Sequence, residues 1–509
     1  MGAIRVAVVG SGPSGSTSAR ILIDAGICVD MYDVGTDSSY VDTASTQHKK
    51  GLVPQKTLFG SSYMYSRRDS LKIKFSQNTS FDTSHAQGGL SVVWGATVAA
   101  ITANDIADWP ISMNELSGHL HNVFDDMPIS ARVDMIDNLY QIKVKGEDLP
   151  YENSQSKFIL EKAELNAKQL IQQGVMVGKA KLAINNLPAS DSACVLCGQC
   201  MSGCDRGSIF NAWNTVQSLQ KHHHFRYFGQ QLVHSFKENE KGVDLTMSSL
   251  LDKGVWQKSY DAVILAAGCI DSTKIVDKSL GWTGHQYKMQ DSQKFYFPLW
   301  VGKGGNDGTN KSISLAHLYV QGIDSSGHVI HAQLYPGKSI IHSILKYHFG
   351  IFGGLISSLI SPFLNRFFIG AAYFSSTVSG AIHIQFSSNN DMIATGESNK
   401  KSVCEFKFFI DKLFKLRKLT GFLPFLRINL KAKIGHSQHF GGTIPMKVKS
   451  EKYESDILGR PYGCHKVFVV DSTVLPSVPA TPTTGLVMAN AARIASSMVM
   501  LLNGRKQTQ

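Results

Sequence analysis

The spacing of apolar residues along the chain predicts alternating strands and helices near both ends. A short apolar run at Val6–Val9 leads into a helical stretch to about Ala25, and a second apolar run at Ile27–Tyr32 ends at Asp33. Near the C-terminus the apolar segment KVFVVDSTVLPS is followed by a loop and by a long helical segment, TTGLVMANAARIASSMVMLL. Strand, turn and helix in this order are the units of an α/β domain.

The middle of the chain has other patterns. Residues 225–267 alternate as strands and end in a buried apolar strand, a glycine and a helix start. Residues 293–335 and 378–388 alternate apolar and polar positions, which is typical of an antiparallel sheet. Residues 115–182 have a mostly helical pattern, with Ser112 as the N-cap. The pattern therefore predicts an α+β region beside the α/β one.

A glycine-rich turn joins the first predicted strand to the first predicted helix. Gly10, Gly12 and Gly15 have the G-x-G-x-x-G spacing. The first glycine allows a tight turn, the second admits a pyrophosphate, and the third lets helix and strand pack closely. The helix N-terminus offers free N–H groups to phosphates, and the Asp33 carboxylate suits an adenosine ribose. A glycine-rich surface turn has the same spacing, but the flanking strand, helix and acid favour dinucleotide binding.

The composition is that of a globular protein whose charge is unevenly placed. Of the 509 residues 43% are hydrophobic and 18% are charged, which excludes a disordered chain. The formal net charge is +12, and residues 400–433 hold ten Lys or Arg against Glu405 and Asp411. Segment 340–371 is nearly all apolar, but glycine, proline and asparagine keep every run below the ~20 residues that a spanning helix needs.

These two segments, 340–371 and 400–433, have two interpretations. Basic residues interleaved with large apolar ones are typical of a face that lies on an anionic membrane. The same pattern fits a helix of a substrate domain whose apolar side is core and whose lysines are solvated. Because no recognition motif accompanies the charge, nucleic acid is not expected as a partner.

The position of the first strand and the spacing of the cysteines indicate where in the cell the protein is located. The first strand begins at about residue 4, which leaves no room for a signal peptide. Four of the eight cysteines lie within eleven residues and the others are scattered, which is no disulfide framework. We expect a cytoplasmic protein, associated with the inner face of the membrane if the membrane interpretation holds.

Five stretches of the chain form a set when they are taken in order. They are the N-terminal glycine fingerprint, GGLSVVWG, DWPIS, VILAAGCIDS, and the C-terminal pair HFGGT and VVDSTVLPS…TPTTGLVMANAARIA. Together they resemble the glucose–methanol–choline (GMC) oxidoreductases, and among them the pyranose-oxidase-like branch. The resemblance extends over the whole chain, although 120–190 and 290–430 match little. It implies an FAD enzyme that oxidises alcohols, including sugar hydroxyls, by hydride transfer to flavin N5.

The resemblance also implies an α/β fold with two parts. One is a Rossmann-like FAD-binding domain assembled from separated segments, and the other is an α+β substrate domain with an antiparallel sheet. We assign residues 1–120, 183–290 and 435–509 to the FAD-binding domain. Residues 121–182 and 291–434 then form the substrate domain.

By the same resemblance, FAD is bound without a covalent link. Pyranose oxidases anchor FAD through a histidine two residues after the G-G-x-S block, where this chain has Val93. Asp471 is expected to lie with its backbone near the flavin pyrophosphate and ribityl chain. The residues expected to bind FAD are Gly10, Gly12, Pro13, Ser14, Gly15, Asp33, Gly88, Gly89, Ser91, Val233, Ala267, Gly268, Asp471, Pro482 and Thr483.

His439 and Thr481 are the expected catalytic residues. His439, in H-F-G-G-T, matches the family's active-site histidine beside the isoalloxazine. An alcohol gives up hydride only when its hydroxyl proton is removed, and a neutral imidazole with a pKa of ~6.5 suits that task. His436 is the rival base. Thr481 stands where many members have Asn or His, and since a threonine is no base, the family's paired arrangement is in doubt.

Cys194, Cys197, Cys200 and Cys204 have the C-x2-C-x2-C-x3-C spacing of bacterial ferredoxin clusters. The proline that usually follows the last cysteine is Asp205 here. Relatives also carry a cysteine-bearing loop at this place. Three interpretations remain open: an iron–sulfur cluster, a zinc site, or reduced thiols without a metal.

The sequence therefore predicts an FAD-dependent dehydrogenase or oxidase that acts on the CH–OH group of a sugar, a glycan or a lipid-linked glycan. An electron-acceptor protein or a quinone is the expected partner of a dehydrogenase. A sterol or lipid-alcohol oxidase that uses oxygen is one alternative. A membrane-associated redox module without catalysis is the other.

Overall fold

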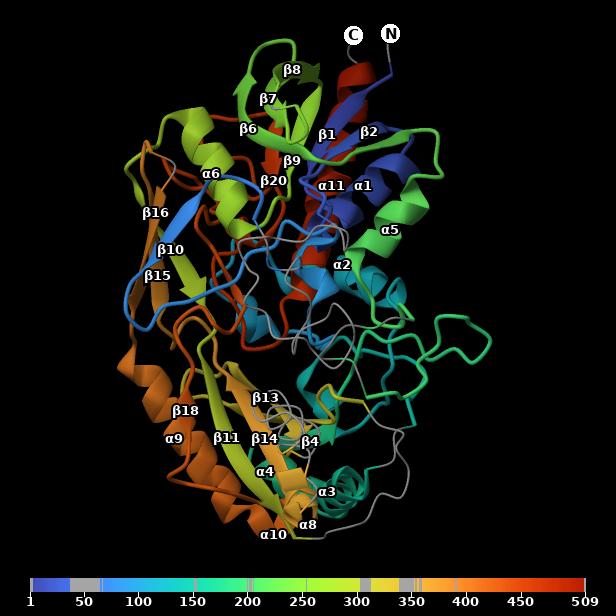
Figure 1. Ribbon diagram of the computed structural model, residues 1–509, viewed down its shortest axis with the longest axis vertical. Coiled ribbons are helices and arrows are strands. Elements are labelled where there is room, and N and C mark those ends of the chain that lie inside the picture. Colours follow the sequence, from blue (N-terminus) through green and yellow to red (C-terminus); the bar gives the residue numbers. More distant parts are fainter. Residues whose placement is uncertain are drawn as a thin grey trace.

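The computed structural model describes residues 3–36, 65, 67–150, 153–198, 200, 204, 206–252, 254–302, 313–337, 352, 355–356, 359–389 and 391–507. One parallel and three largely antiparallel sheets form the molecule, with helices packed around them (Figure 1). The predicted α/β fold class, with a parallel sheet and a region of antiparallel sheet, is therefore confirmed.

A five-stranded parallel sheet has the order β20-β9-β1-β2-β5. Its strands come from distant parts of the chain because parallel neighbours need crossover connections. The strands are β1 (Arg5–Val9), β2 (Cys28–Tyr32), β5 (Phe225–Phe228), β9 (Ala262–Leu265) and β20 (Val467–Val469).

Both faces of this sheet are covered, which explains why its strands are apolar throughout. Val6 and Val8 point into one apolar cluster with the helices, and Ala7 and Val9 point into another on the opposite face. The helices are α1 (Pro13–Asp24), α5 (Ala212–Leu219) and α11 (Thr484–Gln507), which lie side by side (Figure 1). The opposite face carries the antiparallel strands β6 (Gln231–Glu238), β7 (Val243–Ser249) and β8 (Val255–Tyr260).

A larger antiparallel sheet forms the other end of the molecule. Its order is β17-β11-β14-β13-β12-β4, and β18 also pairs with β11. Its strands are β4 (Val175–Lys179), β11 (Lys294–Val301), β12 (Leu318–Ile323), β13 (Val329–Pro336), β14 (Phe367–Tyr373), β17 (Phe422–Pro424) and β18 (Leu430–Lys431). The helices at this end are α3 (Ser154–Leu165), α4 (Ala167–Gln172), α8 (Ser361–Leu364), α9 (Lys400–Lys415) and α10 (Arg417–Thr420).

A third sheet has the order β19-β10-β15-β16-β3 and connects the two ends. Strand β10 leads directly into β11, so consecutive strands belong to different sheets. The strands are β3 (Lys72–Phe75), β10 (Gln286–Asp291), β15 (Ala381–Phe386), β16 (Asp391–Glu397) and β19 (Phe440–Gly441). Helix α6 (Cys269–Leu280) follows β9 and packs against β6.

The helical pattern predicted for 115–182 is only partly present. Helix α2 (Met113–Asp125) begins after Ser112, whose side chain accepts a hydrogen bond from the Glu115 N–H in a capping box. Short helices α3 and α4 follow, but 175–179 is a strand, β4, at the edge of the large sheet. The reason is the sequence VMVGK, since valines fit a pleated surface better than a helix.

Two observations bear on the membrane segments. One helix of the described residues, Thr484–Gly504 in α11, is long and apolar enough to span a bilayer, but 67% of it is buried in the protein. Helix α9 has its apolar side, with Phe406, Phe409 and Leu413, in the core. The buried side of α9 fits the core interpretation of the sequence pattern, and the membrane interpretation of the two segments stays a prediction. The predicted domain boundaries stay a prediction.

Candidate active site

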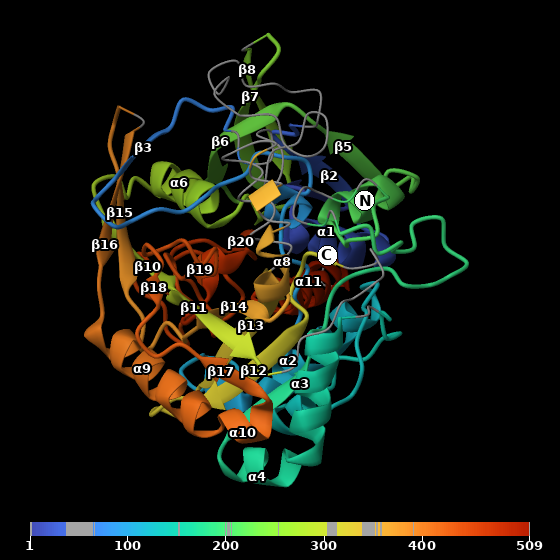
Figure 2. The same ribbon diagram turned by 60° about the horizontal axis from the view of Figure 1, so that its bottom comes forward.

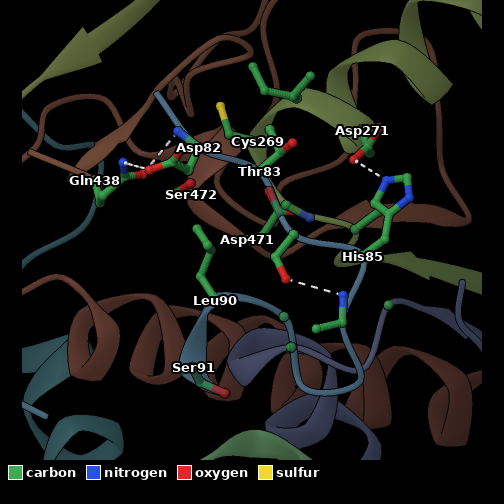
Figure 3. A pocket seen from close by; sticks show the side chains of 18 of the residues that line it. Asp82, Thr83, His85, Leu90, Ser91, Cys269, Asp271, Gln438, Asp471 and Ser472 are labelled. Carbon is green, nitrogen blue, oxygen red and sulfur yellow. Dashed lines mark hydrogen bonds and ion pairs between the residues drawn. The ribbon is translucent and has the colours of Figure 1, made fainter. Parts of the chain in front are cut away.

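A cavity of about 1500 Å³ lies between the parallel sheet and the large antiparallel sheet. The β1–α1 turn, the β9–α6 turn and residues 82–97 line one side, and strands β11, β13 and β14 line the other. Figure 3 shows Asp471, Leu90 and Thr83 around this space. Its volume exceeds the usual size of a small-ligand site, so it has room for a dinucleotide and a substrate together.

The three glycines of the β1–α1 turn have different surroundings. Gly10 has φ +103°, and a Cβ there would lie 2.3 Å from the Ala266 carbonyl oxygen. A Cβ on Gly15 would lie 2.0 Å from the Gly10 carbonyl oxygen, so these two glycines allow close backbone packing. A Cβ on Gly12 would meet no protein atom within 4 Å. Gly12 therefore faces the cavity, where a pyrophosphate is expected.

The N-terminus of α1 fits a phosphate as well. Gly12 is the N-cap, and no side chain caps this helix end among the described residues. The first N–H groups are therefore free to bind an anion from the cavity. Pro13 and Ser14 line the cavity beside Gly12, while Gly15 lies behind it. These residues fit the phosphates of FAD.

Asp33 closes the same turn from the end of β2. Its carboxylate accepts hydrogen bonds from the N–H groups of Ser11 and Gly35, each at 2.6 Å. Burial raises its pKa against the lowering effect of these hydrogen bonds. Asp33 lines the cavity, where its remaining lone pairs can accept from ribose hydroxyls.

A second carboxylate, Asp471, organises the neighbouring turn. It accepts hydrogen bonds from the Gly268 N–H at 2.8 Å and the Ser272 hydroxyl at 2.5 Å, and so fixes the start of α6. Ala267, Gly268 and Asp471 all line the cavity. Burial raises the Asp471 pKa, and its hydrogen bonds oppose that shift.

Residues 88–93 form a third segment at the cavity, next to the β1–α1 glycine turn. The Gly88 N–H donates to the Ser11 hydroxyl at 2.9 Å, and the Ser91 hydroxyl donates to the Gly88 carbonyl at 2.6 Å. A Cβ on Gly89 would lie 3.5 Å from the Gly12 Cα. Gly89, Ser91 and Val93 line the cavity, and Gly88 lies behind them against Trp213.

His439 lines the cavity from the opposite side. It precedes β19, whose Phe440 is the register partner of Asp291 at the end of β10. The His439 carbonyl accepts a hydrogen bond from the Ser292 N–H at 3.0 Å. This pairing holds His439 at the junction of β10 and β11, beside the start of β11.

The His439 imidazole has an unusual environment. Its ring stacks on Tyr373 at 4.9 Å between ring centroids. The Nδ1 atom is buried and has no hydrogen-bond partner among the described residues. Burial, and then the nearby cation of Lys294, lowers the His439 pKa to about 3. The ring is therefore neutral at cellular pH and able to act as a base.

Lys294 was not predicted from the sequence. It is buried at the cavity wall, with its ammonium 5.0 Å from the ring centroid of Tyr296 and 5.7 Å from that of Tyr373. Burial acts to lower its pKa, but Tyr373, Tyr296 and Asp291 together raise it above the usual value. No carboxylate of the described residues lies within ion-pair distance. A lysine at an inward position of the alternating segment KFYFPLW was the available signal.

The other predicted residues divide between the cavity and its surroundings. His436, Val233, Pro482 and Thr483 line the cavity. Partial burial, and then Lys294, lowers the His436 pKa. Thr481 is fully buried, does not line the cavity, and its hydroxyl has no partner among the described residues.

The four clustered cysteines are all free thiols. Cys200 and Cys204 line the cavity, while Cys194 and Cys197 do not. Burial raises the pKa of Cys194 and takes that of Cys200 to about 11, so these two are protonated thiols. Within the described part of the chain, no three of the four sulfur atoms lie within 4.8 Å of one another. The cluster hypothesis therefore rests on the sequence spacing alone.

The described residues do hold one other compact group, Asp69, His85 and Asp271. Arg67 pairs with both carboxylates, at 2.9 Å to Asp69 and 2.6 Å to Asp271, and Lys274 also pairs with Asp69. His85 donates to Asp271 at 3.3 Å (Figure 3), since its Nδ1 accepts from the Arg68 N–H. Because cations already neutralise the acids, this group is an ion-pair network rather than a metal site.

No family model matches the chain, and no curated protein matches its sequence. In structure it is similar to pyridoxine 4-oxidase from Mesorbium loti, with a TM-score of 0.61 and 13% sequence identity. The match covers 97% of this chain and 99% of that chain. It shows a shared fold over the whole length. It does not support the narrower placement in the pyranose-oxidase-like branch.

Proposed function

We propose that the protein is an FAD-dependent oxidoreductase that oxidises the CH–OH group of an alcohol. The observation that carries this proposal is the neutral imidazole of His439 at the cavity wall, opposite a glycine turn that fits phosphates. The fold is shared with a protein described as an oxidase of pyridoxine, which is itself an alcohol. FAD bound at the glycine turn supplies the acceptor for hydride.

The protein's own residues supply the proton chemistry. His439 accepts the hydroxyl proton of the alcohol while the carbon-bound hydrogen leaves as hydride. The Lys294 ammonium stabilises the negative charge that develops on the alcohol oxygen, because a fixed cation acts strongly in a site from which water is excluded. Tyr373, stacked on His439, keeps the imidazole in place.

The substrate side suits a molecule with several oxygen atoms. Its polar groups include Thr97, Gln333 and the hydroxyl of Tyr335, which donates to the Gln333 side-chain carbonyl at 2.6 Å. Such a wall can hydrogen-bond the hydroxyls of a sugar or glycan. A sugar or glycan is therefore the substrate class that we propose first, and a sterol or other lipid alcohol is the second.

The test is anaerobic reduction of the bound flavin by a panel of alcohols. Sugars, glycosides, pyridoxine, sterols and long-chain alcohols are mixed in turn with the purified yellow protein, and loss of the visible flavin band is followed. We expect at least one alcohol to bleach the flavin. If dithionite alone reduces it, the protein is a redox module and the proposal is wrong.

The electron acceptor is a separate question with its own measurement. We propose a dehydrogenase that passes electrons to a protein or quinone, with the cysteine loop at the cavity wall as the side from which they leave. Rapid oxygen consumption with the bleaching alcohol would instead make the protein an oxidase. Iron and acid-labile sulfide in anaerobically purified protein would support an iron–sulfur cluster. Zinc would make the cysteine loop a structural metal site. If the protein contains neither iron nor zinc, the four cysteines are free thiols.

A further inference from the structure

The end of the molecule farthest from the parallel sheet exposes an apolar surface. It is formed by residues 352, 355–356 and 359–369 around α8 and by residues 421–428 around β17, and we call it the basal surface. Figure 2 turns this end forward and shows α8, β17 and α10 on it. Phe363 is 68% exposed and Ile428 is 60% exposed. The other exposed apolar side chains are Phe352, Leu355, Ile356, Leu359, Ile360, Leu423 and Leu426.

The two segments form one surface because the ends of β11 and β14 join them. Phe363 packs on Trp300 of β11, with 6.4 Å between ring centroids. Trp300 is the register partner of Leu423 in β17. Phe367 of β14 packs near Phe425 at 6.3 Å. These contacts place apolar residues from two distant parts of the sequence side by side.

The charges on the two segments that form this surface have a single sign. Residues 352–369 and 421–428 contain Arg366 and Arg427 and no Asp or Glu. Adjacent α9 and α10 add exposed Lys415 and Lys418. Of the two acids in 400–433, Glu405 is buried and accepts hydrogen bonds from the Ser325 hydroxyl and N–H, whereas Asp411 of α9 is partly exposed and offsets one of these cations.

We propose that the basal surface docks on an anionic lipid bilayer. Exposed Phe, Leu and Ile side chains enter the boundary between head groups and acyl chains, and the surrounding Lys and Arg bind the lipid phosphates. Large apolar patches are rare on surfaces that face water alone. The cytoplasmic leaflet, with its negative surface potential, is the membrane that this charge selects.

The same end of the sheet leads to the cavity, and this step rests on the proposed function. Residues two apart on a strand share a face. On β14, Tyr373, Ala371 and Ile369 line the cavity, and the next residue on that face is Phe367, which contacts Phe425 of the basal surface. One strand face therefore runs from His439 to the bilayer. We infer that the alcohol is carried on a membrane lipid, as a lipid-linked glycan or a lipid alcohol.

Vesicle binding tests the docking without any assumption about catalysis. The flavin-loaded protein is sedimented with vesicles of phosphatidylglycerol and phosphatidylcholine, and with vesicles of phosphatidylcholine alone. We expect binding to the anionic vesicles that falls as salt rises. Leu359→Ser/Phe363→Ser and Lys418→Glu/Arg427→Glu should each weaken it by roughly tenfold or more.

Matched controls come from the opposite end, on the β6–β8 sheet. Leu251→Ser/Val255→Ser removes two exposed apolar side chains, and Lys237→Glu/Lys241→Glu reverses two exposed cations. Both should bind vesicles like the parent protein. Equal losses in the controls, or a parent protein that stays in the supernatant, would overturn the proposal. A concentration-dependent dimer that the Leu359→Ser/Phe363→Ser change abolishes would assign the surface to a second copy instead.

A second readout separates docking from the proposed function. Flavin bleaching by a water-soluble alcohol should be the same in parent and basal-surface variants, because none of these residues lines the cavity. Oxidation of an alcohol embedded in anionic vesicles should fall with vesicle binding. Vesicle binding without any bleaching would keep the docking and refute the oxidoreductase. Flavin bleaching without vesicle binding would keep the oxidoreductase and refute the docking.

Discussion

The two sides of the cavity are built by different means. On the cofactor side, glycines and backbone N–H groups meet the ligand, and Asp33 and Asp471 accept several hydrogen bonds from their own turns. On the substrate side, long side chains meet the ligand, and His439 keeps an unpartnered nitrogen. The carboxylates of the cofactor side are therefore satisfied by the protein itself, whereas the substrate side holds a buried, neutral imidazole at the cavity wall.

The largest expected effect is on the cofactor side and tests the glycine roles. Gly12→Val should yield a folded protein that retains no FAD, because Gly12 has ordinary backbone angles and a side chain there would fill the phosphate site. Flavin content after purification measures FAD retention, and circular dichroism measures folding. Gly10→Val is the contrast, and it should also impair folding, since its Cβ would strike the Ala266 carbonyl. A yellow Gly12→Val protein would contradict the placement of the phosphates.

On the substrate side the main effect is expected at His439. His439→Ala should retain FAD, because the residue lies opposite the glycine turn, but lose roughly 10²–10⁴ in the rate of flavin reduction. Stopped-flow absorbance with the bleaching alcohol measures this rate. His436→Ala is the control and should lose much less. If the order is reversed, His436 is the base.

A smaller effect is expected at Lys294, with a pH signature of its own. Lys294→Met should slow flavin reduction by roughly 10²-fold through loss of the cation near the alcohol oxygen. The His439 pKa, now lowered partly by that cation, should rise. Since His439 works as the neutral base, the acid limb of kcat/KM should move to higher pH. In Lys294→Arg the acid limb of kcat/KM should return most of the way to its position in the parent protein. An acid limb that does not move in Lys294→Met would show that Lys294 and His439 do not interact.

The smallest effect is expected at Thr481, which the sequence placed among the catalytic residues. Its hydroxyl is buried away from the cavity without a partner, so Thr481→Val removes an unsatisfied group at nearly constant volume. We expect a rate close to that of the parent and an equal or slightly higher Tm. A loss of more than about tenfold in rate would show that Thr481 reaches the substrate in the complex.

The difference between the two sides also explains what the sequence could predict. The cofactor side is made of short local motifs, so the spacing of Gly10, Gly12 and Gly15 and the acid at Asp33 were enough to locate it. Lys294 and Tyr373 lie nearly eighty residues apart and meet only because β11 pairs with β14. No local pattern encodes that pairing. His439 was found by resemblance to a family motif, and its free nitrogen and its stacking on Tyr373 were not foreseeable.

The basal surface also shows how far a sequence pattern can predict what a face of the protein contacts. The run of lysines and phenylalanines in 400–433 drew attention to α9, yet Phe406 and Phe409 are core residues of the large sheet. Two exposed apolar residues, Val403 and Phe408, are on α9, and those of the basal surface are in the segment after it and around α8. Amphipathic periodicity predicts that a helix has an apolar face, but whether that face meets a sheet or a membrane depends on its tertiary neighbours.

The strand order of the parallel sheet has a consequence for biosynthesis. β1 is made first, but its neighbour β9 is synthesised more than 250 residues later, and β20 later still. In a nascent chain β1 can pair with β2 at once, but the edge of β1 that pairs with β9 stays without its partner for much longer. Such non-local pairing is slow and leaves strand edges exposed to aggregation. We expect that flavin is acquired only after the C-terminal helix has left the ribosome, and that cells short of flavin or chaperones accumulate the insoluble chain.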